Sequence, residues 1–295
     1  MTIYSQIAKN KIRTAFIISF FVLFISFFFY AVGLYFRDPY TFLIFGFIFA
    51  LFSSFGSYFW SDKIVLATVR AHPADKKEYF DLYTVCENLA IADGLPMPKI
   101  YVIDDPAPNA FATGRNPKHA VVCATSGILE RLNRAELEGV IAHELSHVKN
   151  YDILVISIVA VLVGTVALAA DMIMRAMWWG GGDDSDNRNP VFFILFIVVL
   201  IISPIVATLI QLAVSRRREY LADASGALLT RNPDALARAL EKISADQTPL
   251  RSATSSTAHL FIANPLKNNK VSNWFASLFN THPPTEERIR ILHEM

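Results

Sequence analysis

The motif AHELSH, residues 142–147, combines two histidines and a glutamate in the pattern of a metal-dependent hydrolase. His143 and His147 are four residues apart, so on a helix both imidazoles project from one face and can share a Zn²⁺ ion. Glu144 lies beside the first histidine, where it can act as a general base towards a water at that ion. Apolar neighbours indicate a packed helix rather than histidines on a solvated face: Val140, Ile141 and Leu145.

A catalytic zinc ion also needs a third protein ligand and an open position. Asp152 follows His147 by five residues and fits the same helical face poorly. Glu219 is the stronger candidate, because an apolar hairpin between the two motifs would return it to the membrane face that carries His147. Asp223 lies four residues beyond Glu219 and can accept an imidazole N–H. An ion pair between Glu219 and a neighbouring arginine is the alternative.

The elements that must position these residues are dominated by apolar segments. Hydrophobic residues make up 53% of the 295 residues and charged residues only 18%. A bilayer core of about 30 Å requires about 20 apolar residues in a helix. The first segment is too long for a cleavable signal sequence and is interpreted as a retained anchor. We therefore predict four transmembrane helices rather than four buried core helices, at residues 14–36, 39–60, 153–175 and 190–214.

These spans divide the chain into two membrane hairpins and two parts of one soluble domain. The hairpins are predicted at 1–60 and 153–214, and the parts of the domain at 61–152 and 215–295. Basic residues mark the cytoplasmic ends of membrane spans. They precede the first span (Lys9, Lys11 and Arg13) and follow the last (Arg216, Arg217 and Arg218). Both termini and the AHELSH motif are therefore predicted to face the cytoplasm.

The soluble parts alternate helical and extended patterns, which is typical of a small α+β domain. We predict helices at 74–93, 134–150, 215–229, 234–244 and 285–292, and strands at 99–104, 109–115 and 120–129. Asn133 and Glu136 form a capping-box pattern at the start of the motif-bearing helix. The polar stretch 247–273 is expected to be a mobile loop, either a site of self-cleavage or a lid.

The strand at 109–115 offers a binding site for a polypeptide. Asn109, Ala110 and Phe111 are expected to lie on an edge strand, which an extended substrate can join through backbone hydrogen bonds. Such bonds do not depend on the side chains of the bound segment, so the strand would accept polypeptides of varied sequence. Ordinary sheet packing, with Phe111 in the core, is the alternative.

The chain has the motif HELSH on a predicted helix that leads into one membrane span, and the motif EYLAD directly after the next span. In this arrangement it resembles the HtpX heat-shock membrane metalloprotease family. The segments NAFATGR and THPPTEERIRIL also match that family, so the resemblance covers nearly the whole chain. It implies a zincin-like α+β domain with four transmembrane helices. It implies one zinc ion held by His143, His147 and Glu219, with Glu144 as the catalytic carboxylate. It further implies an endopeptidase of a prokaryotic inner membrane that cleaves misfolded or damaged membrane proteins under stress.

A donor is still needed opposite the metal to stabilise a developing oxyanion. His282 is the candidate, because Pro283 and Pro284 would fix its position and the HPP segment is shared with the family. Capping of the last helix is its alternative role. Arg288 could pair with an acid near the site.

Charge and cysteine content limit the partners. The formal charge of +1 gives no reason to expect nucleic acid, and two cysteines indicate reduced thiols rather than a disulfide framework. Polypeptides and the lipid bilayer are the expected partners, and no oligomeric state is indicated. Two other functions remain open: a membrane scaffold that binds zinc without turnover, and a prenyl-peptide processing enzyme, since the family is similar to CAAX prenyl endopeptidases.

Overall fold

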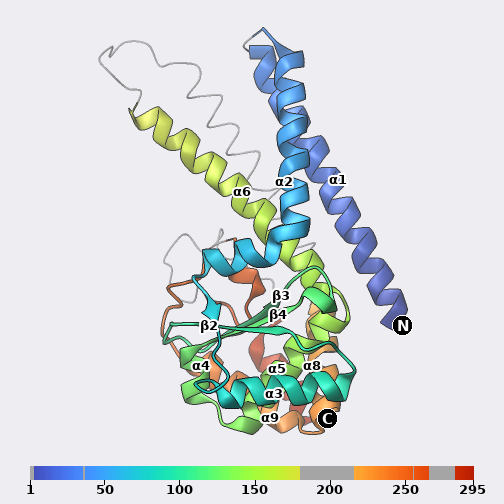
Figure 1. Ribbon diagram of the computed structural model, residues 1–295, viewed down its shortest axis with the longest axis vertical. Helices are drawn as coiled ribbons and strands as arrows, with labels where there is room; N and C mark the ends of the chain where they lie inside the picture. The colour runs from blue at the N-terminus through green and yellow to red at the C-terminus, as the bar shows by residue number, and fades with distance from the viewer. Residues whose placement is uncertain (1–2, 36, 180–215, 255, 266–282) are drawn as a thin grey trace.

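Long helices extend from a globular α+β part in the computed structural model (Figure 1). The structure describes residues 3–35, 37–179, 216–254, 256–265 and 283–295. Helices α1 (Ile3–Tyr35), α2 (Pro39–Thr68) and most of α6 (Asp152–Trp179) form the extension. The N-terminal end of α1 lies beside the globular part, so α1 and α2 run away from it and return (Figure 1).

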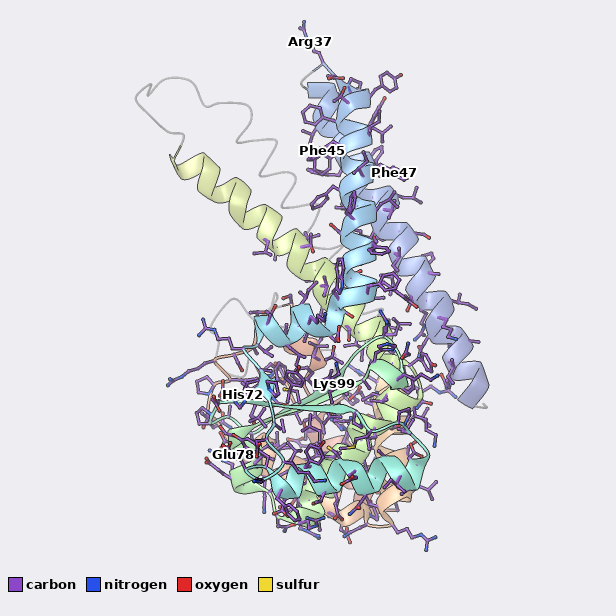
Figure 2. The ribbon with its side chains drawn as sticks, in the orientation of Figure 1. Arg37, Phe45, Phe47, His72, Glu78 and Lys99 are labelled. Carbon is purple, nitrogen blue, oxygen red and sulfur yellow. The ribbon has the colours of Figure 1, made fainter. Side chains whose placement is uncertain are left out.

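Two of the described helices, α1 and α2, are long and apolar enough to cross a membrane. A third is added if α5 and α6 count as one bent span. Side chains such as Phe45 and Phe47 point outward from α2, whereas Arg37 lies at the far end of the hairpin (Figure 2). Helix α2 continues to Thr68, beyond the end predicted at Trp60. The fourth predicted span, 190–214, lies outside the described residues.

A small mixed sheet separates these helices from the rest of the globular part. Its strands pair in the order β1-β2-β4-β3, with β2 and β4 parallel and the outer pairs antiparallel. The predicted edge position is confirmed, because β3 is the last strand. The strands are β1 (His72–Pro73), β2 (Lys99–Ile103), β3 (Ala110–Thr113) and β4 (Val121–Thr125).

Helices cover the face of the sheet that lies away from the long helices (Figure 1). They are α3 (Phe80–Asp93), α5 (Arg134–Lys149), α8 (Arg216–Thr230), α9 (Pro233–Ala245) and α11 (Thr285–His293). The predicted capping box at α5 is present, since Asn133 and Glu136 each accept the other's backbone N–H. Buried aliphatic side chains of these helices and the sheet form one core, which fixes α5 against the other elements.

Three predictions about the soluble elements are corrected by the structure. The strand predicted at 120–129 ends at Thr125, because the Thr125 hydroxyl caps a short helix α4 (Ser126–Arg131). The helix predicted at 74–93 begins only at Phe80. Residues 247–254 and 256–265 of the predicted loop are packed rather than loose, since Leu250 and Phe261 are buried and the backbone N–H groups of residues 251 and 252 donate to Asp105. Residues 266–273 of that loop lie outside the described residues.

Candidate metal centre

The two halves of the candidate site meet where α5 packs against α8. Helix α5 carries His143, Glu144 and His147, and α8 carries Glu219. The helices approach closely because Gly226 has no side chain: a Cβ there would lie 3.0 Å from the backbone nitrogen of His143. Both motifs are therefore held by regular helices of the folded core.

The three predicted ligands have the spacing that one ion requires. The Nε2 atoms of His143 and His147 are 3.2 Å apart. Carboxylate oxygens of Glu219 lie 3.8 Å from the first nitrogen and 3.5 Å from the second. Tetrahedral ligands placed at ~2.1 Å from a zinc ion are separated by about 3.4 Å. The residues present therefore fit a divalent metal, and all three are buried.

Each imidazole is oriented by a carboxylate on its other side. Nδ1 of His143 lies 2.9 Å from Oδ1 of Asp223, and Nδ1 of His147 lies 3.1 Å from Oδ2 of Asp152. A carboxylate at Nδ1 favours a proton on that nitrogen and leaves the Nε2 lone pair for a metal. Asp223 therefore lies beside His143, as predicted, and its support of a metal ligand stays a prediction.

Asp152 takes a place that its sequence spacing did not suggest. Five residues after His147, it would leave the ligand face of a continuous helix. The chain instead turns by 85° between α5 and α6, and Tyr151 at the turn has a φ of +60°. The turn swings Asp152 back against His147, where its carboxylate meets Nδ1 rather than the ligand face.

The carboxylate of Asp223 is held by a buried arginine from the end of the chain. Nε and Nη2 of Arg288 donate to its two oxygens at 2.8 and 2.7 Å. Burial alone would raise the pKa of Asp223, but the guanidinium outweighs burial and lowers it to about 2. The proposed pairing of Arg288 with an acid near the site is therefore confirmed, and Asp223 stays ionised beside His143.

Negative charge accumulates around the ligands. Burial raises the pKa of Glu144 to about 7, with Glu219 adding to the effect and a hydrogen bond from the backbone of Ala112 opposing it. Burial would lower the pKa of His147, but the nearby carboxylates of Asp152 and Glu219 have the larger effect, so the pKa is raised. Charges that hold a proton on a buried imidazole also attract a divalent cation.

A narrow cavity joins these groups. Its accessible volume is about 10 Å³, and its lining includes Glu144 together with the three ligands. Part of its wall is formed by residues 259–262, the middle of a buried segment from Ala258 to Ala263 that we call the covering segment. Such a cavity holds roughly one water, so an extended peptide does not fit beside the ligands in this conformation.

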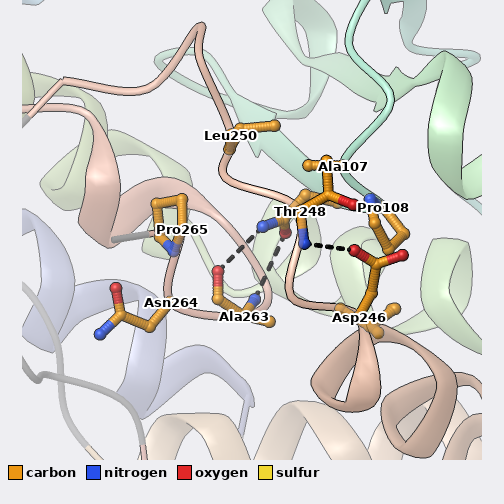
Figure 3. Close-up of a pocket in the computed structure, with 10 residues that line it drawn as sticks. Ala107, Pro108, Asp246, Thr248, Leu250, Ala263, Asn264 and Pro265 are labelled. Atoms are coloured by element: carbon orange, nitrogen blue, oxygen red, sulfur yellow. Dashed lines mark hydrogen bonds between the residues drawn. The ribbon is translucent and has the colours of Figure 1, made fainter. Parts of the chain in front are cut away.

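The covering segment lies along the predicted substrate strand. The N–H of Ile262 donates to the carbonyl of Ala110 at 3.0 Å. The Asn109 amide binds Ala263 twice, donating to its carbonyl at 2.9 Å and accepting from its N–H at 3.4 Å. These bonds are the two dashed lines that end at Ala263 in Figure 3. Phe111 is fully buried against Phe261 in the core. Ala112, rather than these three residues, lines the metal cavity.

His282, the predicted oxyanion donor, lies outside the described residues. The structure also brings to the site residues that the sequence analysis did not assign to it. Asn10 and Arg218 both contact Asp152. The only sequence signals were an amide near the start of an apolar helix and one basic residue within an arginine run. The covering segment had no signal beyond its apolar residues at 260–263.

The chain is similar to known proteins over most of its length. Residues 76–295 match Peptidase family M48. A Protease HtpX homolog from Tropheryma whipplei (strain Twist) is 48% identical over 293 residues, covering 99% of this chain and 98% of that protein. Another Protease HtpX homolog, from Dictyoglomus turgidum, is 45% identical over 295 residues, which cover 100% of this chain and 95% of the relative.

A solved structure shares the fold. The crystal structure of S. mikatae Ste24p superposes with a TM-score of 0.52 at 18% identity. The match covers 98% of this chain and 66% of Ste24p, and at that identity it bears on the fold alone. With the family match over residues 76–295 and the full-length relatives, we conclude that the chain belongs to peptidase family M48 and is a membrane metallopeptidase.

Proposed function

We propose that the protein is a zinc-dependent endopeptidase that cleaves misfolded or damaged membrane proteins at the cytosolic face of a prokaryotic plasma membrane, as part of a stress response. One zinc ion per chain is held by His143, His147 and Glu219. The observation that carries this proposal is the spacing of the three ligand atoms around a cavity that Glu144 also lines.

The chain's own residues supply the proton transfers of peptide hydrolysis. A bound zinc ion would polarise the scissile carbonyl and lower the pKa of the attacking water. Glu144 accepts a proton from that water and later delivers it to the leaving amine. Asp223 and Asp152 keep the Nε2 atoms of the two histidines directed at the cavity. His282 is proposed to stabilise the oxyanion.

The membrane arrangement completes the proposal. The hairpins at 1–60 and 153–214 anchor a protease domain made from 61–152 and 215–295. The N-terminal end of α1, which carries Lys9, Lys11 and Arg13, lies beside the globular part (Figure 1). Basic residues favour the cytosolic side of a membrane, which supports a cytosolic position for the site.

We infer that a polypeptide substrate adds to the outer edge of β3. The carbonyl of Ala110 accepts a backbone N–H from Ile262 there, so this edge can pair with another stretch of backbone. A substrate strand takes the same position, which requires the covering segment to move aside. Asn109, Ala110 and Phe111 then support that strand, with Ala112 nearest the metal cavity.

Replacing Glu144 with glutamine tests the proposed chemistry. Glu144→Gln keeps the side-chain size and removes the base, so the purified protein should retain zinc while casein cleavage falls by about 10²- to 10⁴-fold. Glu138→Gln, on the same helix but partly exposed, is the matched control and should cleave normally. Cleavage by Glu144→Gln at the wild-type rate would exclude Glu144 as the base. A wild-type protein that binds zinc and cleaves nothing would instead be a scaffold.

A substrate panel tests the proposed specificity. Wild-type protein in detergent is given an unfolded membrane protein and a prenylated peptide, with and without a chelator. Chelator-sensitive cleavage of the unfolded protein supports the proposal. A strong preference for the prenylated peptide would instead assign the protein to prenyl-peptide processing. Metal analysis of the same sample identifies the ion and its stoichiometry, since affinity order alone does not select zinc.

A further inference from the structure

Asn10 is a buried amide on the first membrane helix that reaches the metal-binding part of the chain. Its side chain is only 1% exposed. Nδ2 donates to the carbonyl of Asn150 at 2.9 Å and to Oδ1 of Asp152 at 2.8 Å. Both acceptors belong to the turn between α5 and α6, about which the chain changes direction by 85°. The contacts join residues 140 or more positions apart.

Asp152 connects this amide to a proposed zinc ligand. Oδ1 accepts from Asn10 and also from Nη1 of Arg218 at 3.1 Å. Oδ2 faces Nδ1 of His147 at 3.1 Å. With two donors on one oxygen, the carboxylate plane is fixed and the other oxygen is aimed at the imidazole. A continuous chain of contacts therefore runs from α1 through Asp152 to His147.

We propose that Asn10 is a positioning residue for the metal centre, so that the N-terminal membrane helix is part of the zinc site. This inference rests on the proposed role of His147 as a ligand. By holding Asp152 in place, Asn10 keeps the proton of His147 on Nδ1 and its Nε2 directed at the ion. Loss of α1 from its position would then weaken metal binding as well as membrane anchoring.

The chemistry of the contact favours an amide over other side chains at position 10. An NH₂ group has two hydrogens, one for each of its two acceptors. An aspartate of the same shape would offer no donor and would place a second negative charge beside Asp152. An apolar residue would leave the Asn150 carbonyl without this partner. A residue that only filled space at this contact would need no donor at all.

The test measures zinc affinity in the full-length protein purified in detergent. Asn10→Ala, Asp152→Asn and the double variant are compared with wild type by competition against a chelator. Loss of a group that orients a zinc ligand lowers affinity by about 10- to 100-fold, and Asn10→Ala should lie near the lower end. Because Asn10 acts through Asp152, it should change affinity little further in the Asp152→Asn background. The absorption bands of the Co²⁺-substituted protein should shift in Asn10→Ala.

Thr14→Val is the matched control. Thr14 is buried one turn further along α1, and its hydroxyl has no hydrogen-bond partner among the described residues. This variant should keep wild-type affinity and cobalt spectrum.

An Asn10→Ala protein that melts at a lower temperature without zinc, yet binds zinc as wild type does, would show that Asn10 only stabilises the fold and would overturn the inference. The inference would also be overturned if Asn10→Ala lowered zinc affinity as much in the Asp152→Asn background as in the wild-type background. Wild-type protein that binds no zinc would defeat the proposed function itself.

Discussion

Each histidine of the candidate metal centre has a carboxylate close to its Nδ1 atom, and the two carboxylates are held by different regions of the molecule. On one side, Nδ1 of His143 faces Asp223, and Arg288 binds both oxygens of that carboxylate. All three residues belong to the globular part, on α5, α8 and α11. We call this the globular side of the site.

On the other side, which we call the membrane side, Nδ1 of His147 faces Asp152. Arg218 contributes one hydrogen bond to this carboxylate and Asn10 contributes another. Asp152 begins α6, and Asn10 belongs to α1, so two of the long helices take part.

The difference teaches how the site depends on its surroundings. On the globular side, Arg288 binds Asp223 through two parallel hydrogen bonds between charged groups, which is a strong and geometrically specific contact. The membrane side has one hydrogen bond from a charged donor, Arg218, and one from a neutral amide, Asn10, and the second bond forms only when α1 is docked. We therefore expect damage to the globular side to affect folding most, and damage to the membrane side to affect metal affinity most.

Arg288→Met gives the largest expected effect, because it breaks the globular side. The variant leaves the Asp223 carboxylate buried without its cation, and breaking a buried pair in this way costs about 3–5 kcal/mol of stability. Denaturant unfolding of the detergent-purified protein measures the loss. Arg290→Met, on the same helix, removes an exposed pair with Glu294 and should change stability by less than about 1 kcal/mol. Equal losses in the two variants would remove the distinction between buried and exposed pairs.

Asp152→Asn breaks the membrane side and should act on zinc more than on folding. Arg218 and Asn10 can still meet the amide oxygen, but the negative charge that favours the Nδ1 proton of His147 is gone. Zinc affinity should fall by about 10- to 100-fold, as measured by chelator competition. Asp81→Asn, at an exposed pair with Arg134, is the control and should leave affinity unchanged. A larger loss of stability than in Arg288→Met would reverse the proposed order of the two sides.

The local parts of the site could be predicted from the sequence. The i,i+4 spacing of His143 and His147 has one consequence on any helix, namely two imidazoles on one face. The capping residues Asn133 and Glu136 were equally informative, because a capping box depends only on neighbours in the chain. Glu219 was found by combining its motif with the expected hairpin, and its position beside both histidines agrees with that reasoning.

The supporting contacts could not be predicted, because they depend on how the chain turns. Asp152 was rejected as a metal ligand on the assumption that the helix continues past His147. No glycine or proline near Tyr151 indicates the turn that the chain makes there. Asn10 lies on an element that hydropathy assigns simply to the membrane. Its partners are fixed by the docking of α1, which periodicity does not describe. The same holds for the covering segment, whose backbone contacts carry no side-chain signature.

Gly226→Ala tests the element that the two sides share, since Glu219, Asp223 and Arg218 all lie on α8. The added Cβ would approach the backbone nitrogen of His143 at 3.0 Å, which forces α8 away from α5. We expect a loss of about 1–3 kcal/mol in stability and weaker zinc binding, read from unfolding and chelator competition.

Gly56→Ala on α2 is the comparison for Gly226→Ala. Its Cβ would meet only the Trp60 side chain, at 3.8 Å, so the variant should be as stable as wild type or slightly more so. A Gly226→Ala protein with wild-type affinity and stability would show that the close approach of α8 does not control the site.

The smallest expected effect concerns the covering segment, which is tied to both sides of the site. Nη1 of Arg288 donates to the carbonyl of Ile262 at 3.1 Å, and Nε2 of His259 lies 3.3 Å from the carbonyl of Ile156 on α6. If a substrate strand displaces the segment from β3, binding of a zinc-chelating peptide inhibitor should speed hydrogen exchange at the Ile262 amide by about tenfold, by raising the population of the open state.

In Arg288→Met the same amide should exchange faster even without inhibitor, because one of the two ties is already lost. Thr14→Val leaves both ties in place and should exchange as wild type. Unchanged exchange at Ile262 with inhibitor bound would mean that the peptide enters elsewhere than the β3 edge. The covering segment would then be a fixed wall of the cavity rather than a segment that opens to admit substrate.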